Sequence, residues 1–234
     1  MSRQQVYFED LGLIDYKKGW DYQTSLFQKT VNQKIHNRKN PEEQKTTNNY
    51  LIFCEHPHVF TLGKSGSNDN LLINEEELVL KKARFYNINR GGDITYHGPG
   101  QIVAYPIFDL DHFFSDIHKY LRFLEEAVIL TLLEYGIKSG RVDGLTGVWI
   151  DGGSVNARKI CALGVKSSRW VTMHGIGFNV NTKLDFFNYI VPCGIEGKQV
   201  TSMQKELGVT LDIEEVKSKL KLNFSNVFGF DIVE

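Results

Sequence analysis

The sequence predicts a single α+β domain in which a mixed β-sheet is flanked by helices. Three observations predict it: strand-like and helix-like segments intermingle along the chain, the strand segments outnumber the long helices, and several strands follow one another through short connections. A doubly wound fold would alternate strands and helices more regularly. The length of 234 residues and the hydrophobic fraction of 41% suit one globular domain over residues 1–234.

The first half of the chain predicts two helices among its strands. Apolar side chains recur at helical spacing over residues 16–38, and Asn74 followed by Glu77 is typical of a capped helix start. Residues 37–49 are polar and predict a surface loop. The strands expected here are residues 6–9, 50–54, 59–62, 85–89 and 101–108.

The second half opens with a long helix that Ser115 begins and Gly136 ends, because apolar residues again keep helical spacing between them. Three strands follow, and Asp151-Gly152-Gly153 indicates a hairpin between the first two. The segments expected are strands at 147–150, 159–165 and 171–181, a helical turn at 184–189, and helices at 201–207 and 212–222.

Composition excludes several classes of protein. The net charge of −1 gives no support for nucleic-acid binding. No apolar run reaches membrane-spanning length and the N-terminus lacks a signal-peptide core, so we expect a cytoplasmic protein. The three cysteines, Cys54, Cys161 and Cys193, are an odd number without paired spacing, which argues against a disulfide framework.

Residues 90–101, here called the Gly-rich segment, form the most informative stretch. They read Arg-Gly-Gly-Asp-Ile-Thr-Tyr-His-Gly-Pro-Gly-Gln, with four glycines, one proline and one histidine. Glycine lets a backbone approach a ligand closely, and a packed core rarely needs such a cluster. We therefore expect a substrate loop, in which His97 contacts the ligand or serves a structural role.

Cys193, between Pro192 and Gly194, is the candidate nucleophile; a buried structural thiol is the alternative. A free thiol has a pKa of about 8.5, so a nearby ammonium group would be needed to ionise it near neutral pH. Lys159 lies in a mostly apolar strand and either supplies that charge or extends to solvent from the strand end. Cys54 and Cys161 are interpreted as structural.

Small residues predict where an acyl chain would bind. Ala162 and Gly164 share one face of a strand, and Gly175 and Gly177 share one face of the next. If the two faces adjoin, they form an apolar groove; a bulge or close sheet packing is the alternative. His174 is a further proton-transfer candidate. Cys54, His56 and His58 offer no fourth ligand and Pro57 interrupts them, so no metal is expected. No nucleotide-binding motif is present.

Together these pieces resemble the lipoyl(octanoyl) transferases, the LipB family. The resemblance covers about residues 51–208 and consists of six motifs in the family's order. They are residues 55–63, the Gly-rich segment, Gly147-Val148-Trp149, residues 159–164, residues 174–180 and Pro192-Cys193-Gly194-Ile195. Asp93, Gly177, Phe178 and a lengthened 151–157 hairpin depart from the family's usual pattern.

The resemblance implies a biotin/lipoate protein ligase-like (class II synthetase-like) fold and an acyltransferase that needs no cofactor. Its reaction moves an octanoyl group from octanoyl-acyl carrier protein to a lysine of a lipoyl domain, the first step of endogenous protein lipoylation. Acceptors would be 2-oxoacid dehydrogenase acyltransferase subunits and the glycine cleavage H protein. Cys193 would carry the acyl thioester and Lys159 would lower its pKa. The implied substrate-binding residues are Arg90, Gly91, Gly92, Asp93, Ile94, Thr95, Tyr96, His97, Ala162, Leu163, Gly164, Gly175, Ile176 and Gly177.

Three other functions stay open. An ATP-dependent lipoate ligase on the same fold would not need Cys193. A Cys–His hydrolase with His97 or His174 as base would release free octanoate. A non-catalytic module would only bind the acyl carrier protein.

Overall fold

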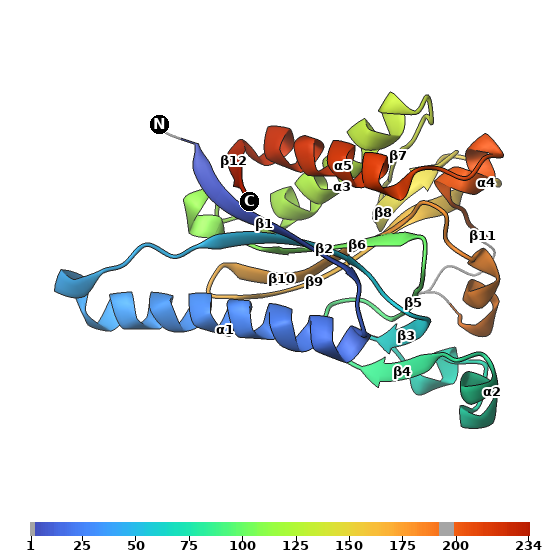
Figure 1. The fold of residues 1–234 in the computed structure, drawn as a ribbon, viewed down its shortest axis with the longest axis horizontal. Helices are drawn as coiled ribbons and strands as arrows, with labels where there is room; N and C mark the ends of the chain where they lie inside the picture. The colour runs from blue at the N-terminus through green and yellow to red at the C-terminus, as the bar shows by residue number, and fades with distance from the viewer. Residues whose placement is uncertain (1–2, 192–198) are drawn as a thin grey trace.

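A computed structural model describes residues 3–191 and 199–234 and confirms the α+β class (Figure 1). Its main sheet is mixed, with the order β12-β1-β2-β6-β10-β9-β8-β7 and with β11 added to β9. The main-sheet strands are β1 (Gln4–Leu13), β2 (Asn49–Glu55), β6 (Gln101–Ile107), β7 (Gly140–Val142), β8 (Leu145–Ile150), β9 (Arg158–Ser168), β10 (Val171–Asn179), β11 (Gln199–Val200) and β12 (Phe230–Val233). A small sheet contains β4 (Arg84–Asn87), β3 (Val59–Leu62) and β5 (Ile94–His97).

Helices cover both faces of the main sheet, as Figure 1 shows. On one face, α3 (Ile117–Glu134) and α5 (Ile213–Phe228) pack on each other and on the largest core cluster. On the other face, α1 (Tyr16–Lys39) packs over β10 and β6. The shorter helices are α2 (Glu75–Leu80) and α4 (Met203–Leu207), with 3-10 turns at Pro41–Glu43, Asn68–Asn70, Leu110–His112 and Leu184–Tyr189.

The helix limits follow from capping. Asn74 and Glu77 form the predicted capping box at the start of α2. The long helix α3 begins one residue later than predicted, because Asp116, not Ser115, accepts the Lys119 N–H. It ends before Gly136, whose φ of +72° suits glycine.

Three strands of the main sheet, β7, β11 and β12, were absent from the sequence prediction, and α5 is longer than predicted. The helix was expected to stop at residue 222, yet it continues to Phe228 and ends at the left-handed Gly229. That turn returns β12 to pair in parallel with β1. The strand β1 was predicted only in part, as four residues of a strand of 10. The short β7, β11 and β12 have too few residues for a period to be recognised.

The Gly-rich segment connects the two sheets. Its first part leads into β5 of the small sheet, and its last residue opens β6 of the main sheet. In the main sheet β6 pairs with β10 and β10 pairs with β9, both antiparallel. The segment also contacts β9, because the Gly91 N–H donates to the Val165 oxygen at 2.9 Å.

Glu125 of α3 is fully buried, and this burial supports a prediction about stability. Its carboxylate lies 3.0 Å from Arg141 Nε and 3.1 Å from Arg122 Nη1, and it accepts the Gly147 N–H at 2.9 Å. Glu125→Ala leaves the buried Gly147 N–H without its charged acceptor and removes both ion pairs, so it should lower the free energy of unfolding by about 3 kcal/mol.

The neighbouring Glu126 supplies the control. It pairs with the same Arg141 but its side chain is 38% exposed, so Glu126→Ala should cost under about 1 kcal/mol. Urea unfolding measures both; equal losses would show that the burial of Glu125 is not what stabilises this region.

None of the helices in the described part of the chain is long and apolar enough to cross a membrane.

Candidate active site

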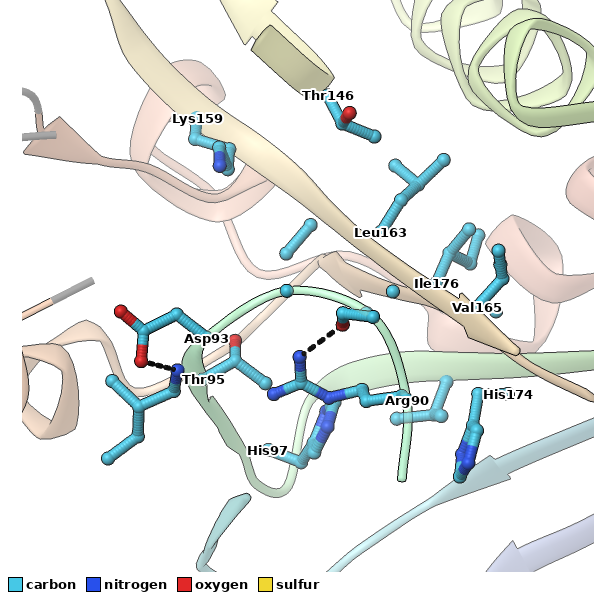
Figure 2. A pocket seen from close by; sticks show the side chains of 18 of the residues that line it. Arg90, Asp93, Thr95, His97, Thr146, Lys159, Leu163, Val165, His174 and Ile176 are labelled. Carbon is cyan, nitrogen blue, oxygen red and sulfur yellow. Dashed lines mark hydrogen bonds between the residues drawn. The ribbon is translucent and has the colours of Figure 1, made fainter. Parts of the chain in front are cut away.

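A cavity of about 400 Å³ lies between the Gly-rich segment and the β9–β10 pair (Figure 2). It is lined by every described residue of the predicted site except Tyr96. The Tyr96 ring is fully buried in a separate core, where it stacks on Phe186 and its hydroxyl meets His58 Nδ1 at 2.7 Å. The sequence therefore located the walls of the cavity, although a strand residue that points away from it was included.

The small-residue faces of β9 and β10 adjoin, as predicted. Gly175 pairs with Gly164, and Gly177 pairs with Ala162. These glycines also allow the Gly-rich segment to approach the two strands closely. A Cβ on Gly164 would lie 2.9 Å from the Gly91 oxygen, and one on Gly177 would lie 3.3 Å from His97 Cε1. Groove formation and close packing, the two alternatives from the sequence, therefore occur together.

The Gly-rich segment is fixed to both sheets. Arg90 is buried, and its Nη2 donates to the Thr61 backbone oxygen at 2.7 Å and to Thr61 Oγ1 at 3.1 Å. The Gly91 N–H donates to the Val165 oxygen at 2.9 Å. The segment therefore contacts β9 beyond the residues that pair with β8. The segment thus covers the cavity without occupying it.

Asp93, which departs from the family pattern, is held by hydrogen bonds. One carboxylate oxygen accepts the Ile94 N–H and the other accepts Asn70 Nδ2, both at 2.6 Å. The backbone oxygen of Asn70 accepts the Val191 N–H at 2.8 Å. The charge of Asp93 is therefore engaged at the rim, on the side where the chain continues toward residue 192.

Lys159 lines the cavity at the end nearest β8 and β11, and Figure 2 shows its side chain there. Its Nζ lies 4.7 Å from the centre of the Trp149 ring, a cation–π contact. Its backbone oxygen accepts the Thr201 N–H at 2.9 Å, and Val200 of β11 is its register partner. Gly147, at φ +124°, leaves room for the lysine stem: a Cβ there would lie 3.3 Å from Lys159 Cε.

Cys193 and the Pro192–Ile195 motif lie outside the described residues. The other two cysteines are fully buried, and burial raises the pKa of both Cys54 and Cys161 well above that of a free thiol. Because a thiolate is the nucleophilic form, these two cysteines are poor nucleophiles.

A hydrogen-bonded chain connects His97 with the strand beside Lys159. His97 Nδ1 contacts Gln101 Oε1 at 2.6 Å, Gln101 Nε2 donates to Asn179 Oδ1 at 2.9 Å, and Asn179 Nδ2 donates to the Thr201 oxygen at 3.0 Å. Desolvation, with the neighbouring His56, lowers the pKa of His97 to about 3. A neutral ring whose Nδ1 donates to Gln101 presents Nε2 as an acceptor.

Several cavity residues were not singled out from the sequence. Gln101 and Asn179 lie within two of the six motifs. The others come from segments that carry no motif, and only the fold brings them to the site: Tyr16, Val103, Tyr105, Leu121 and Thr146. The described residues contain no group of three or more candidate metal ligands. His56 instead contacts the Tyr105 hydroxyl and the Ile14 oxygen, both at 2.8 Å.

Three histidines with lowered pKa values predict acid sensitivity. Burial lowers the pKa of His56 to about 4 and the pKa values of His97 and His174 to about 3. Since the unfolded chain binds a proton near pH 6.5, stability is full above that pH and falls as the pH drops toward the folded pKa values. We expect roughly 2 kcal/mol lost per residue by pH 5.

The measurement is urea unfolding at pH 7 and pH 5. His56→Gln removes one of the three groups, so the loss between the two pH values should shrink by roughly 2 kcal/mol. A matching change at the exposed His118, His118→Gln, should leave it unaltered. An unchanged loss in His56→Gln would contradict the assignment.

Comparison with known proteins agrees with this geometry. Residues 15–225 match the model of the lipoyl protein ligase A/B catalytic domain. A protein of Christiangramia forsetii named octanoyltransferase is 61% identical over 98% of each chain. Another of that name, from Cytophaga hutchinsonii, is 58% identical over 99% of this chain and 96% of its own. A bipartite lipoate protein ligase of Thermoplasma acidophilum superimposes with a TM-score of 0.69 at 18% identity, covering 100% of this chain and 87% of that one. This last similarity concerns the fold alone, and it confirms the predicted architecture.

Proposed function

The chain belongs to the lipoyl protein ligase A/B catalytic-domain family, and on that premise we propose that its octanoyl transfer proceeds through an acyl thioester on Cys193, with Lys159 as proton donor and acceptor. The enzyme is an octanoyltransferase of lipoate biosynthesis, and lipoyl domains are its acceptors. The observation that carries this conclusion is the identity of 58–61% with octanoyltransferases over almost the whole chain.

We take octanoyl-acyl carrier protein as the donor. The Cys193 thiolate attacks the thioester carbonyl, a new carbon–sulfur bond forms, and the carrier sulfur leaves with a proton from the Lys159 ammonium. The amine of the acceptor lysine then attacks octanoyl-Cys193. The amide bond forms, the bond to Cys193 breaks, and the amine's proton passes to Lys159. Both steps balance without a nucleotide or a redox partner.

Two features of the described residues support this pair. Cys54 and Cys161 are buried thiols with raised pKa values, so Cys193 is the remaining cysteine of the three. Lys159 lines the cavity and is paired with β11, which follows Cys193 by a few residues in the sequence. A lysine so placed in a mostly apolar cavity favours the electrostatic role over extension into solvent.

The hydrolase alternative requires a histidine that takes a proton from a thiol. The neutral His97 and His174 rings have pKa values lowered to about 3, too low for an efficient base near neutral pH. Their environment favours a structural or hydrogen-bonding role in the cavity.

Reconstitution without nucleotide tests the proposed function. The enzyme is mixed with octanoyl-acyl carrier protein and a lipoyl domain, and the mass of the lipoyl domain is followed. We expect one octanoyl amide per domain with no ATP present, and no release of octanoate beyond the background. Transfer only from free octanoate plus ATP would identify a ligase instead, and free octanoate without an amide product would identify a hydrolase.

The proposal also covers which proteins accept the octanoyl group and where in the cell the enzyme acts. We expect lipoyl domains of 2-oxoacid dehydrogenase acyltransferase subunits and the glycine cleavage H protein to be modified, in the cytoplasm. Parallel assays with the two kinds of acceptor measure which is preferred.

A further inference from the structure

The cavity has two distinct ends along the β9–β10 pair. Lys159 lies at one end, and the lining residues of β9 continue from there to Val165. Val165 pairs with His174, which is the first lining residue of β10. The next pair, Met173 and Lys166, does not contribute, and Met173 is buried in the core beneath α1. Within the described part of the chain, the cavity therefore ends at the level of His174.

The stretch of consecutive lining residues on β9 suits a medium acyl chain. From Ala162 to Val165 it spans three strand steps, or ~10 Å at ~3.3 Å per residue, and Lys159 lies three further steps along the strand. The ~10 Å stretch is comparable with an extended octanoyl chain whose carbonyl lies on the Lys159 side of Ala162. A longer chain would have to pass the level of His174.

His174 has an unusual backbone for a strand residue, with φ at +60°. Left-handed backbone is disfavoured for residues that carry a Cβ and persists where the surroundings enforce it. The ladder between β10 and β6 ends at Ile176–Ala104, and Pro106 follows on β6. A Cβ on Gly175 would lie 2.7 Å from Pro106 Cδ and 2.1 Å from the Ala104 oxygen. The buried Gln23 of α1 fixes the bend by accepting the His174 N–H at 2.9 Å.

The bend places the imidazole in the cavity. Figure 2 shows His174 beside Arg90, at the opposite side of the view from Lys159. The residue is 2% exposed, and its Nε2 lies 3.4 Å from Asn89 Oδ1. Burial lowers the pKa of His174 to about 3, so the ring is neutral at physiological pH. A neutral ring can meet a methyl terminus without burying a charge against it.

We propose that His174 closes the inner end of the cavity and sets the longest acyl chain that this enzyme transfers efficiently. The inference rests on the proposed function, because it takes the cavity to hold the acyl group. In this role the left-handed bend directs the His174 side chain into the path of the substrate.

Two substitutions test this role without adding backbone strain. His174→Gly removes the ring at a positive φ that glycine adopts freely. His174→Asn keeps a smaller polar side chain that tolerates the left-handed region. Lys82→Gly is the matched control, because Lys82 is also a non-glycine residue with positive φ, +52°, and does not line the cavity.

The assay offers octanoyl-, decanoyl- and dodecanoyl-acyl carrier protein together, with a lipoyl domain as acceptor, and mass spectrometry gives the product ratio. In His174→Gly the decanoyl-to-octanoyl ratio should rise roughly 10- to 200-fold, the range found when a pocket discriminates one small apolar group. His174→Asn should give an intermediate rise, and Lys82→Gly should match the unaltered enzyme.

The outcomes separate the two proposals. An unchanged ratio in both His174 variants, with octanoyl transfer intact in the unaltered enzyme, would overturn the role of His174 alone. Absence of octanoyl transfer in the unaltered enzyme would overturn the proposed function. If neither variant folds, the unaltered enzyme still decides: equal transfer of octanoyl and dodecanoyl groups would show that no chain-length limit exists.

Discussion

Replacing Cys193 with alanine should reduce octanoyl transfer by roughly 10⁴-fold or more, the scale seen when a catalytic nucleophile is removed. The reason is that the reaction would then need direct attack of the acceptor amine on the carrier thioester. Its rate is measured from the mass of the lipoyl domain over time, with the carrier protein in excess.

Cys54→Ala and Cys161→Ala are the controls for this prediction. Both thiols are buried away from solvent, and neither lines the cavity. Each variant should transfer octanoyl groups at a rate within a few-fold of the unaltered enzyme. The assay is run below the unfolding temperature of each variant, so that a loss of stability does not lower the rate. Near-normal transfer by Cys193→Ala would instead support direct attack, as in a ligase-type active site.

Replacing Lys159 with alanine should slow both half-reactions by roughly 10²- to 10⁴-fold, the range of general acid–base catalysis. The ammonium group lowers the thiol pKa and protonates the leaving sulfur, so its loss should also shift the rise of thiol alkylation with pH to higher pH. Iodoacetamide labelling of Cys193 at a series of pH values measures this shift independently of transfer.

Lys159→Arg separates the two roles of the lysine. It keeps a positive charge beside the Trp149 ring but cannot give up its proton at physiological pH. Labelling of the Cys193 thiol at low pH should therefore be largely retained, whereas octanoyl transfer should stay slow. If Lys159→Ala and Lys159→Arg label and transfer like the unaltered enzyme, Lys159 is a structural lysine.

Local sequence patterns were sufficient to predict most helices and strands and the segments that line the cavity. Helical spacing located α1 and α3, and the capping pair Asn74 and Glu77 located α2. Alternation put Ala162 and Gly164 on one face of a strand and Gly175 and Gly177 on one face of the next, and the structure pairs Gly164 with Gly175. These features depend on residues close in sequence, which is why a single chain reveals them.

Features that depend on tertiary contacts escaped prediction. Tyr16 and Tyr105 reach the cavity only because α1 and β6 pack beside the Gly-rich segment. The bend at His174 depends on Pro106 of a neighbouring strand, and the burial of Glu125 depends on its partner Arg141 beyond the end of α3. The chain beyond residue 222 was predicted poorly because β12 is defined by pairing with β1, at the other end of the sequence.

The most direct test of the thioester mechanism is to locate the acyl group on the enzyme itself. The enzyme is incubated with octanoyl-acyl carrier protein and no acceptor, quenched in acid, digested and mapped by mass spectrometry. The mechanism predicts one octanoyl group per chain, on the peptide that contains Cys193, and its disappearance when a lipoyl domain is added. An octanoyl group on Cys54 or Cys161, or transfer with no acyl-enzyme at any time, would contradict it.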